Sequence, residues 1–508
     1  MVNKPNINTI NEVYGFSKLS KQKQVESTIL AKNVNSILEV TATPVLEKVE
    51  KDGKFIKIEG VNYIKIMYED NDSNNCLVDN KCNFTEIIES DCENFCSTCV
   101  VNLQDIDFKA NNDEIKVNAI LNIQSNIYKQ KDIQYVDCLN DLCVLPNEIS
   151  VKTLVSNDIV SYNESFEVDL GKNVARVLNC YATISPKNIT TDNGNINLEL
   201  SISTTLTYEM ADEYMSLNSH VENFDFIKNI SVEGCYDDCQ AICNTNLQLD
   251  KLQVICEEVD GNMLAKIDLP LLTQYVCLKN VVVQSVLDAY STTNELNISR
   301  TNISSIDLSN EIFVNEKIDT NVVISDENKT IEKIYSYVCN SVDLTKLVAE
   351  DNNIIVEGVA YCTILYKSYD RENELTKNDS IITEIPFATS IKQQNINNND
   401  VLVGYATPMS CDVRIKRTQE LDILAEIKLH ILTLKEKCVE IVNDIEIGED
   451  KEINNHPLNI YLVQKGKSYW DIAKELSVEI DELQNQNIEV SLPSDKIERI
   501  VYYKQKQL

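Results

Sequence analysis

The chain has 508 residues, and its 46 Lys and Arg against 80 Asp and Glu give a formal net charge of −34. Such a surface repels phosphate backbones and anionic lipid headgroups, which argues against nucleic-acid binding and against electrostatic binding to membranes. The hydrophobic fraction of 43% is that of a globular protein. Residues 459–508 are nearly neutral, with seven basic and eight acidic residues, so the charge lies on the preceding part of the chain.

Neither a signal peptide nor a membrane span is expected. The first 16 residues contain no apolar run, and no apolar run anywhere approaches the roughly 18 residues of a spanning helix. We therefore expect the chain to stay in a reducing cytoplasm with its 17 cysteines as thiols. Because this number is odd, the cysteines cannot all pair within the chain.

Two segments far apart in the sequence are closely similar. Residues 56–68 read IKIEGVNYIKIMY and residues 354–366 read IIVEGVAYCTILY, with seven of thirteen positions identical and no gap. Both contain a Glu-Gly-Val triplet, and a tyrosine ends each segment. An internal repeat at this level indicates two copies of one structural unit.

A third copy lies between these two, at an offset of 140 residues from the first. Lys-Asn-Val at 32–34 recurs at 172–174, and Tyr68 recurs as Tyr208. This copy is divergent, because residues 199–201 read Glu-Leu-Ser in place of the Glu-Gly-Val triplet.

Each unit is predicted to consist of antiparallel strands. Apolar residues between 196 and 208 share one parity, the pattern of a half-buried strand, and Asp-Gly at 52–53 and Asp-Asn-Gly at 192–194 predict tight hairpin turns. We therefore expect a mainly β protein with three tandem β-sandwich-like units. The expected organisation is an N-terminal lead over 1–28, β units over 29–150, 151–310 and 311–445, a linker over 446–458 and a small domain over 459–505.

The small domain is predicted to have the order β-α-α-β. Ser468 followed by Asp471 has the spacing of a helix capping box. The apolar stripe of this helix would consist of Tyr469, Ile472, Ala473 and Leu476. Trp470, the only tryptophan of the chain, lies about 100° to one side of that stripe, and Lys474 lies one turn further along the same flank. A second helix would bury Leu483 and end near Asn487.

These features resemble two known families. Tandem units with Glu-Gly-Val-x-Tyr and a further tyrosine five residues later resemble the SPOCS domains of spore-coat proteins from endospore-forming bacteria, over about residues 29–445. The tail resembles a LysM domain through Gly466, Trp470, Leu483 and Asn487. Where that family usually has an aspartate after the glycine, this chain has Lys467, in a loop with which LysM domains bind N-acetylglucosamine chains.

Proteins with this layout are spore-coat morphogenetic adaptors. The resemblance implies a non-enzymatic scaffold in the mother-cell cytoplasm, at the forespore surface, whose LysM-like tail docks on the coat basement-layer ATPase SpoIVA. The residues expected to bind this partner are Lys467, Tyr469, Trp470, Lys474 and Asn487. The main alternative is a LysM anchor that binds peptidoglycan or cortex, and a third class is a wall hydrolase that carries a LysM targeting module.

Two interpretations of Trp470 stay open at this point. In one, the indole packs on the small domain itself, because such domains need their aromatic residues for their own core. In the other, Trp470 and Lys474 form an exposed or half-exposed flank beside the Lys467 loop and bind a partner with an acidic rim.

The remaining candidates for chemistry are cysteines and histidines. The cysteine groups are Cys76, Cys82, Cys92, Cys96 and Cys99, and then Cys235, Cys239 and Cys243. Neither shows a paired C-x-x-C spacing, so reduced thiols are the favoured interpretation, with metal binding and oxidative cross-linking as alternatives. His220, His430 and His456 are scattered, and no Gly-rich phosphate loop is present. We expect no enzyme, no cofactor and no metal.

Overall fold

The computed structural model describes residues 6–72, 74–111, 113–137, 142–212, 216–324, 328–452 and 458–503. Strands account for 80% of the chain and helices for 4%, and every strand pair is antiparallel, so the predicted mainly β fold is confirmed. Within this described part, no helix is long and apolar enough to cross a membrane.

The strands fall into three successive groups. The first consists of β1 (Ile7–Leu30), β2 (Val34–Asp52), β3 (Phe55–Asp70), β4 (Asn75–Glu89), β5 (Phe95–Ala110) and β6 (Glu114–Val136). The second consists of β7 (Cys143–Asp169), β8 (Val174–Asp192), β9 (Asn195–Met210), β10 (Leu217–Ser231), β11 (Cys239–Leu247), the 3-10 helix η1 (Leu249–Lys251), β12 (Gln253–Val259) and β13 (Asn262–Tyr290). The third consists of β14 (Asn294–Val323), β15 (Lys329–Glu350), β16 (Asn353–Asp370), β17 (Leu375–Lys392), β18 (Val401–Arg417) and β19 (Glu420–Asp450).

The same topology occurs in all three groups. The second, third and fourth strands form one sheet, in the orders β2-β3-β4, β8-β9-β10 and β15-β16-β17. The first strand pairs with the last, which also pairs with the strand before it, in the orders β1-β6-β5 and β14-β19-β18. In the second group β7 pairs with β13, while β11 and β12 together take the place of β5 and β18. We call these groups units one, two and three.

The irregularities of the strands repeat as well. The pairing of β2 with β3 has register shifts at 34/36, 37/39 and 46/48, and the pairing of β8 with β9 has them at 174/176, 177/179 and 186/188. Each shift therefore recurs at the 140-residue offset that relates the two sequences. Bulges bend a strand at a defined position, so units one and two share the bends of these strands as well as their order.

The structure explains the glycine of the Glu-Gly-Val triplet. A Cβ on Gly60 would lie 2.4 Å from the carbonyl oxygen of Val45 and 2.5 Å from the Phe84 ring. At Gly358 the corresponding distances are 2.5 Å to the carbonyl oxygen of Asp343 and 2.6 Å to the Phe387 ring.

Both phenylalanines are the cross-strand partners of these glycines. Leu200 of unit two pairs with Phe226 in the same way. The divergent copy therefore keeps the aromatic partner although a leucine stands where the other two units have the glycine.

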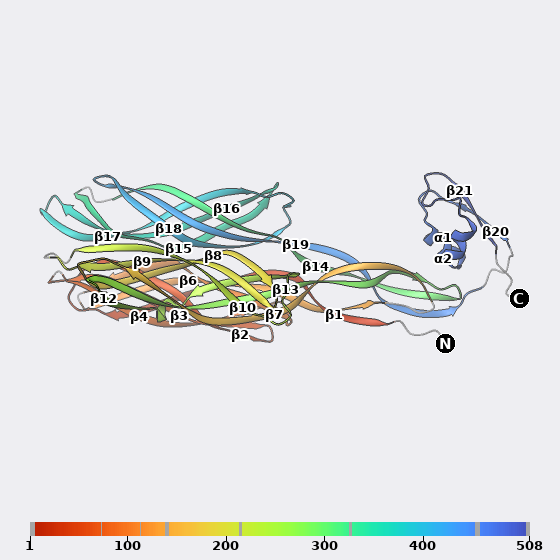
Figure 1. The fold of residues 1–508 in the computed structure, drawn as a ribbon, viewed down its shortest axis with the longest axis horizontal. Helices are drawn as coiled ribbons and strands as arrows, with labels where there is room; N and C mark the ends of the chain where they lie inside the picture. Colours follow the sequence, from red (N-terminus) through yellow and green to blue (C-terminus); the bar gives the residue numbers. More distant parts are fainter. Residues whose placement is uncertain are drawn as a thin grey trace.

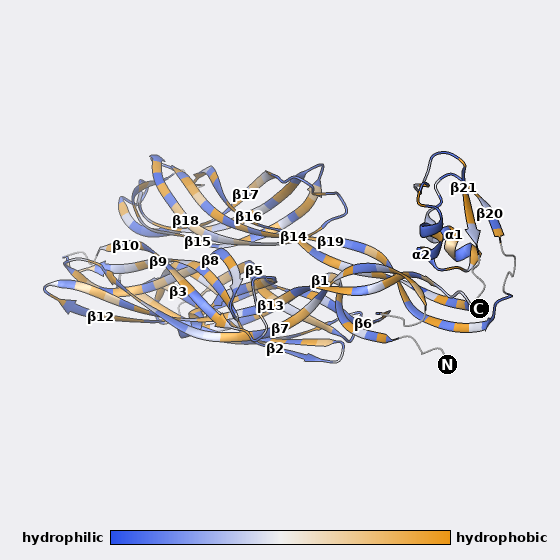
Figure 2. Cartoon of the chain, turned by 45° about the vertical axis from the view of Figure 1, so that its right-hand side comes forward, coloured by the Kyte–Doolittle hydropathy of each residue, from blue (hydrophilic) through white to orange (hydrophobic). Residues whose placement is uncertain are grey.

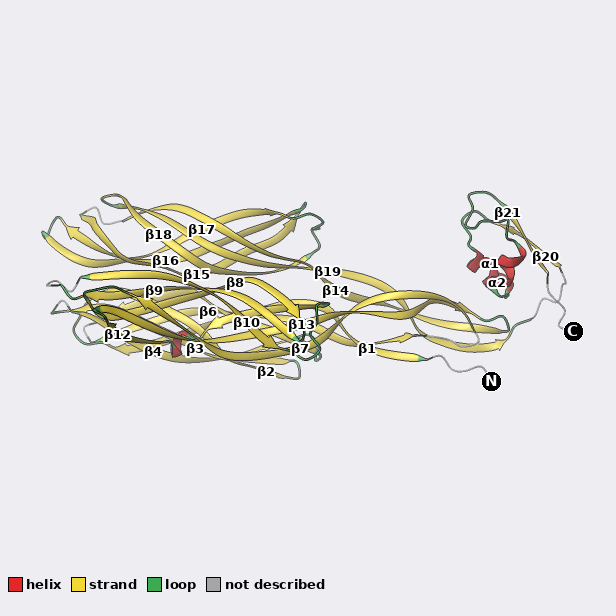
Figure 3. Ribbon diagram, in the orientation of Figure 1, coloured by secondary structure: helices red, strands yellow, loops and turns green. Residues whose placement is uncertain are grey.

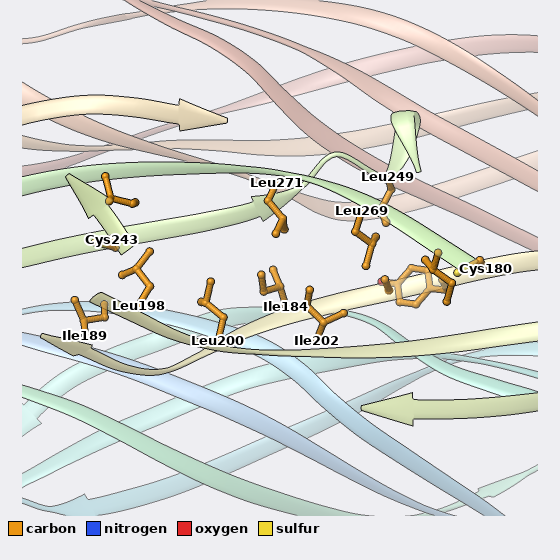
Figure 4. Packing of buried hydrophobic residues seen from close by; sticks show 14 of the residues in the cluster. Cys180, Ile184, Ile189, Leu198, Leu200, Ile202, Cys243, Leu249, Leu269 and Leu271 are labelled. Carbon is orange, nitrogen blue, oxygen red and sulfur yellow. The ribbon is translucent and has the colours of Figure 1, made fainter. Parts of the chain in front are cut away.

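The core of each unit lies between its two sheets. In unit two, side chains of β8 and β9 face those of β11 and β13, as Figure 4 shows for Ile184, Leu198 and Leu200 opposite Leu269 and Leu271. The residues with the predicted parity between 196 and 208 are all buried, which confirms that alternation. Hydrophobic and hydrophilic residues alternate along the strands of the whole body (Figure 2).

The first and last strands of the units extend beyond the sheets and pack together. Figure 1 shows these long strands running side by side towards the end where the tail lies. Their shared core draws on all three pairs, β1/β6, β7/β13 and β14/β19. It consists of Ile133, Ile149, Val151, Val283, Ile303 and Ile441, and further along of Val136, Val286, Ala289, Val442 and Ile445. We call this extension the stalk.

The strand bounds differ from the domain boundaries that the sequence suggested, because the strands of the stalk run across those boundaries. The lead expected over 1–28 contains most of β1, and the boundaries expected at 150/151 and 310/311 fall within β7 and β14. These strands have 24 to 30 residues because each serves first the stalk and then a sheet. Of the expected linker 446–458, residues up to Asp450 belong to β19, and 453–457 lie outside the described residues.

Candidate functional site

The tail contains the chain's two α-helices among the described residues (Figure 3). Its elements are β20 (Leu458–Val463), α1 (Tyr469–Leu476), α2 (Ile480–Gln486) and β21 (Glu498–Tyr503), and β20 pairs with β21. The predicted capping box is present, because the Ser468 side chain accepts from the Asp471 backbone and the Asp471 carboxylate accepts from Ser468 N–H. The elements therefore follow each other in the predicted β-α-α-β order.

The core of the tail lies between the helices and one face of its small sheet. It is formed by Val463, Ile472, Ala473, Leu483, Ile500 and Tyr502. Of the predicted stripe, Ile472 and Ala473 are buried, whereas Tyr469 and Leu476 lie at its margin. Trp470 is off this stripe, as the helical geometry indicated.

Trp470 packs on the body of the protein at the tip of the stalk. Only 9% of the residue is exposed. Its indole lies edge-on to the Tyr290 ring, with the ring centroids 5.0 Å apart, and its Nε1–H donates to Asp288 Oδ2 at 3.0 Å. The expectation of an exposed Trp470 flank is therefore wrong. The off-stripe side chain makes a contact within the chain, and its partners lie on β13, 180 and 182 residues earlier.

Asp288 is the centre of this contact, which we call the latch. Lys474 Nζ donates to both carboxylate oxygens of Asp288, at 2.8 and 2.6 Å, and Arg300 contributes a further ion pair at 2.8 Å. Burial alone would raise the pKa of Asp288. The hydrogen bonds from Lys474 and Trp470 outweigh burial and hold the pKa of this carboxyl below its usual value.

Backbone geometry helps to present Asp288. The pairing of β13 with β7 shifts register between Val286 and Asp288, so a bulge interrupts the strand immediately before the carboxylate. Bulges often re-aim a side chain at a functional position. Three smaller contacts accompany the latch.

These accompanying contacts join the stalk to the turn that follows α1. Tyr290 Oη donates to the carbonyl of Val478 at 2.7 Å, Lys451 Nζ to Ser477 Oγ at 3.0 Å, and Cys143 Sγ to Glu479 Oε2 at 3.2 Å.

The other predicted partner-binding residues serve the tail itself. Lys467 forms an ion pair with Glu475 and donates to the Tyr461 hydroxyl at 3.0 Å, and these partners raise the pKa of Lys467. Tyr469 Oη donates to the carbonyls of Asn487 and Val490.

The Asn487 side chain connects α2 with β21. Its amide nitrogen donates to the carbonyls of Leu483 and Val501, and its oxygen accepts from Val501 N–H. The structure therefore does not bring the five predicted residues together into one exposed surface.

Sequence reasoning missed a second face of the tail. The side of the β20–β21 sheet that faces away from the helices pairs Leu458 with Tyr503, Ile460 with Val501 and Leu462 with Arg499. Ile460 is 56% and Leu462 65% exposed. We call these six side chains the outer sheet face. Its signal in the sequence is the apolar alternation at 458, 460 and 462.

The cysteines gather differently from their sequence grouping. Among the residues that the structure describes, one group has ligand atoms within 4.8 Å of each other, and it joins Cys235 and Cys239 to Cys277 of β13. Cys243, which the sequence grouped with the first two, is not part of it. The earlier group around Cys96 forms no such cluster in the described chain.

The histidines are distributed over the body. His430 is buried, stacks on Phe313 with centroids 4.4 Å apart and lies 2.8 Å from Glu311 Oε1, so it belongs to a cross-strand aromatic pair. His220 lies 3.2 Å from Glu222 on the same strand, and His456 lies outside the described residues.

A scan against protein-family models finds no match for this chain, and neither do searches of curated proteins and of solved structures.

Proposed function

We propose that this chain is a non-enzymatic adaptor of the endospore coat, which docks on the basement-layer ATPase SpoIVA through its LysM-like tail. Two resemblances support the proposal, that of residues 29–445 to tandem SPOCS domains and that of residues 459–505 to a LysM domain. Its place of action would be the forespore surface in the mother-cell cytoplasm. The body would serve as a long β scaffold that carries the tail at the tip of its stalk.

The observation that carries the proposal is the outer sheet face. Five of its six side chains are apolar, and together they form a strip along two strands. Apolar surface of this kind marks interaction sites when it is contiguous. The opposite side of the tail is engaged already, because α1 packs on the stalk through Trp470. A partner therefore meets the tail at β20 and β21.

The distribution of charge over the chain limits which kinds of partner surface can bind the outer sheet face. The body carries nearly all of the −34 and repels acidic surfaces, whereas the tail is close to neutral. Arg499 stands at one end of the apolar strip, beside Leu462. The face thus fits an apolar segment of another protein that ends in a carboxylate. Glycan binding would instead use the Lys467 loop, where the ammonium group is engaged by Glu475 and Tyr461.

The test is binding of the purified full-length chain to purified SpoIVA by biolayer interferometry. The variant Ile460→Glu/Leu462→Glu places two charges in the apolar strip. Loss of such anchors typically costs about 2 kcal/mol or more, so we expect at least a roughly thirtyfold weaker complex. The matched control is Ile227→Glu/Val323→Glu, because these residues are each 65% exposed but lie on the body.

Two results would overturn the proposal. One is equal binding of the variant and the wild type to the ATPase. The other is a wild-type chain that pellets with purified peptidoglycan and does not bind the ATPase, which would favour the alternative anchor function.

A further inference from the structure

Three buried thiols meet in unit two where the chain crosses from one sheet to the other. Cys235 lies in the turn after β10, Cys239 begins β11 and Cys277 lies on β13. All three side chains are buried, and their sulfur atoms lie within 4.8 Å of one another. The Sγ atoms of Cys277 and Cys235 are 3.6 Å apart.

Local backbone structure prepares this arrangement. Gly234 adopts a left-handed φ of +81°, and Cys239 N–H closes a turn on the carbonyl of Tyr236 at 2.9 Å. The two cysteines therefore point to the same side of a tight turn. The strand register adds the third thiol, because Ala241, two residues after Cys239, pairs with Cys277.

We propose that Cys235, Cys239 and Cys277 supply three ligands of one Zn²⁺ ion, with a water molecule in the fourth position. The spacing of the first two, C-x3-C, lies in the range found at structural zinc sites. With Zn–S bonds of about 2.3 Å, tetrahedral geometry places two sulfur ligands about 3.8 Å apart, close to the 3.6 Å between Cys235 and Cys277. Asp238 Oδ1 lies 3.7 Å from Cys239 Sγ but outside the cluster of mutually close thiols, so this carboxylate is a neighbouring charge of the site.

Neighbouring groups suit a site of high negative charge. The Tyr236 backbone N–H points at Cys239 Sγ over 3.4 Å, and such hydrogen bonds stabilise a thiolate. The Lys279 ammonium lies 3.1 Å from Asp238 Oδ2 and offsets part of the negative charge of this carboxylate and of the three thiolates beside it. When each sulfur–zinc bond forms, its thiol releases one proton to solvent, so binding releases three protons.

A hollow in the surface adjoins the site. This hollow, beside β11 and β14, is lined by Asp237, Cys239 and Glu311 together with the threonines at 190 and 191. Its carboxylates attract a cation, and Cys239 is one of the residues that line it. A bound ion would tie the turn between the two sheets of unit two to β13, and would stabilise the divergent unit by mass action.

Full-length protein, reduced and freed of metal with a chelator, is titrated with Co²⁺ and then with Zn²⁺. We expect one Co²⁺ per chain with the charge-transfer absorption of cobalt–thiolate bonds, displacement by Zn²⁺, and a higher melting temperature with Zn²⁺. Cys277→Ser should weaken binding by more than the ten- to hundredfold that loss of an outer-shell partner typically costs. Cys243→Ser is the matched control and should bind as the wild type does.

The charge beside the site is tested with Asp238→Asn against Asp237→Asn. The first should weaken binding about ten- to hundredfold, and the second by much less. Circular dichroism of each metal-free variant shows whether it is folded. The titration of the wild type tests metal binding whether or not a variant folds. Absence of cobalt–thiolate absorption in the reduced wild type would overturn the proposal. So would loss of binding in Cys243→Ser together with unchanged binding in Cys277→Ser.

Discussion

Removal of the Asp288 carboxylate should release the tail from the stalk. Asp288→Ala leaves the Trp470 indole N–H and the Lys474 ammonium without their shared acceptor. Hydrogen bonds to charged groups contribute about 1.5–3 kcal/mol each, but the Lys474 side chain is 41% exposed, so its share is reduced by solvent. We estimate about 2–3 kcal/mol for the latch, which lowers the ratio of docked to undocked tail by about 30- to 150-fold.

The composition of the chain provides the assay. Trp470 is the only tryptophan, so its fluorescence reports on the latch without labelling. In the wild type the buried indole should emit at short wavelength and resist quenching by acrylamide. In Asp288→Ala the emission should shift to longer wavelength and quenching should increase.

A matched control separates the latch from general effects of charge. Glu440 is the other carboxylate that contacts Arg300, at 3.5 Å, and it lies on β19. Glu440→Ala should therefore leave the Trp470 emission unchanged. If Asp288→Ala also leaves emission and quenching unchanged, the carboxylate does not hold the tail and the account of the latch is wrong.

Three further predictions concern stability and pH. Gly60→Ala and Gly358→Ala should each lower the free energy of unfolding by about 2 kcal/mol or more, because the new Cβ would clash with the backbone of the neighbouring strand. Gly15→Ala is the control and should be tolerated, since its Cβ would meet only the flexible Lys129 side chain at 3.6 Å. Urea denaturation measures the free energy of unfolding of all three variants. Because the pKa of Asp288 is lowered, its contribution to docking is complete above the usual value of 3.8 and is lost only as the pH falls through the lower folded value. The Trp470 emission should therefore stay constant from pH 7 to pH 5, and a red shift in that range would contradict the ion-pair geometry. Tyr290→Phe should weaken docking by about 1 kcal/mol through loss of its hydrogen bond, measurable as a small rise in acrylamide quenching.

Local patterns in the sequence predicted local structure well. The alternation between 196 and 208, the Asp-Gly turn before β3 and the capping box at Ser468 each depend on neighbours within a few residues, and each is present. The stalk was not predicted. Its strands are continuous with the sheet strands, so no turn or change of pattern marks where the stalk part of a strand ends and its sheet part begins.

The candidate sites show the same limit. Helical geometry correctly separated Trp470 from the core stripe of its own helix, but the acceptor Asp288 lies on a strand of the body, and no local pattern relates the two. Cys235 and Cys239 were recognised from their spacing, while Cys277 joins them through the register of β11 on β13. Long-range pairing of this kind decides which side chains meet.

Hydrogen–deuterium exchange of the full-length chain, with and without purified SpoIVA, tests the adaptor proposal most directly. It locates the contact on the wild-type protein and requires no substitution. We predict protection of the backbone amides of β20 and β21 when the ATPase binds, with exchange in α1 and at the end of β13 unchanged. Unchanged exchange in β20 and β21, or protection confined to α1 with faster exchange around Asp288, would contradict docking through the outer sheet face.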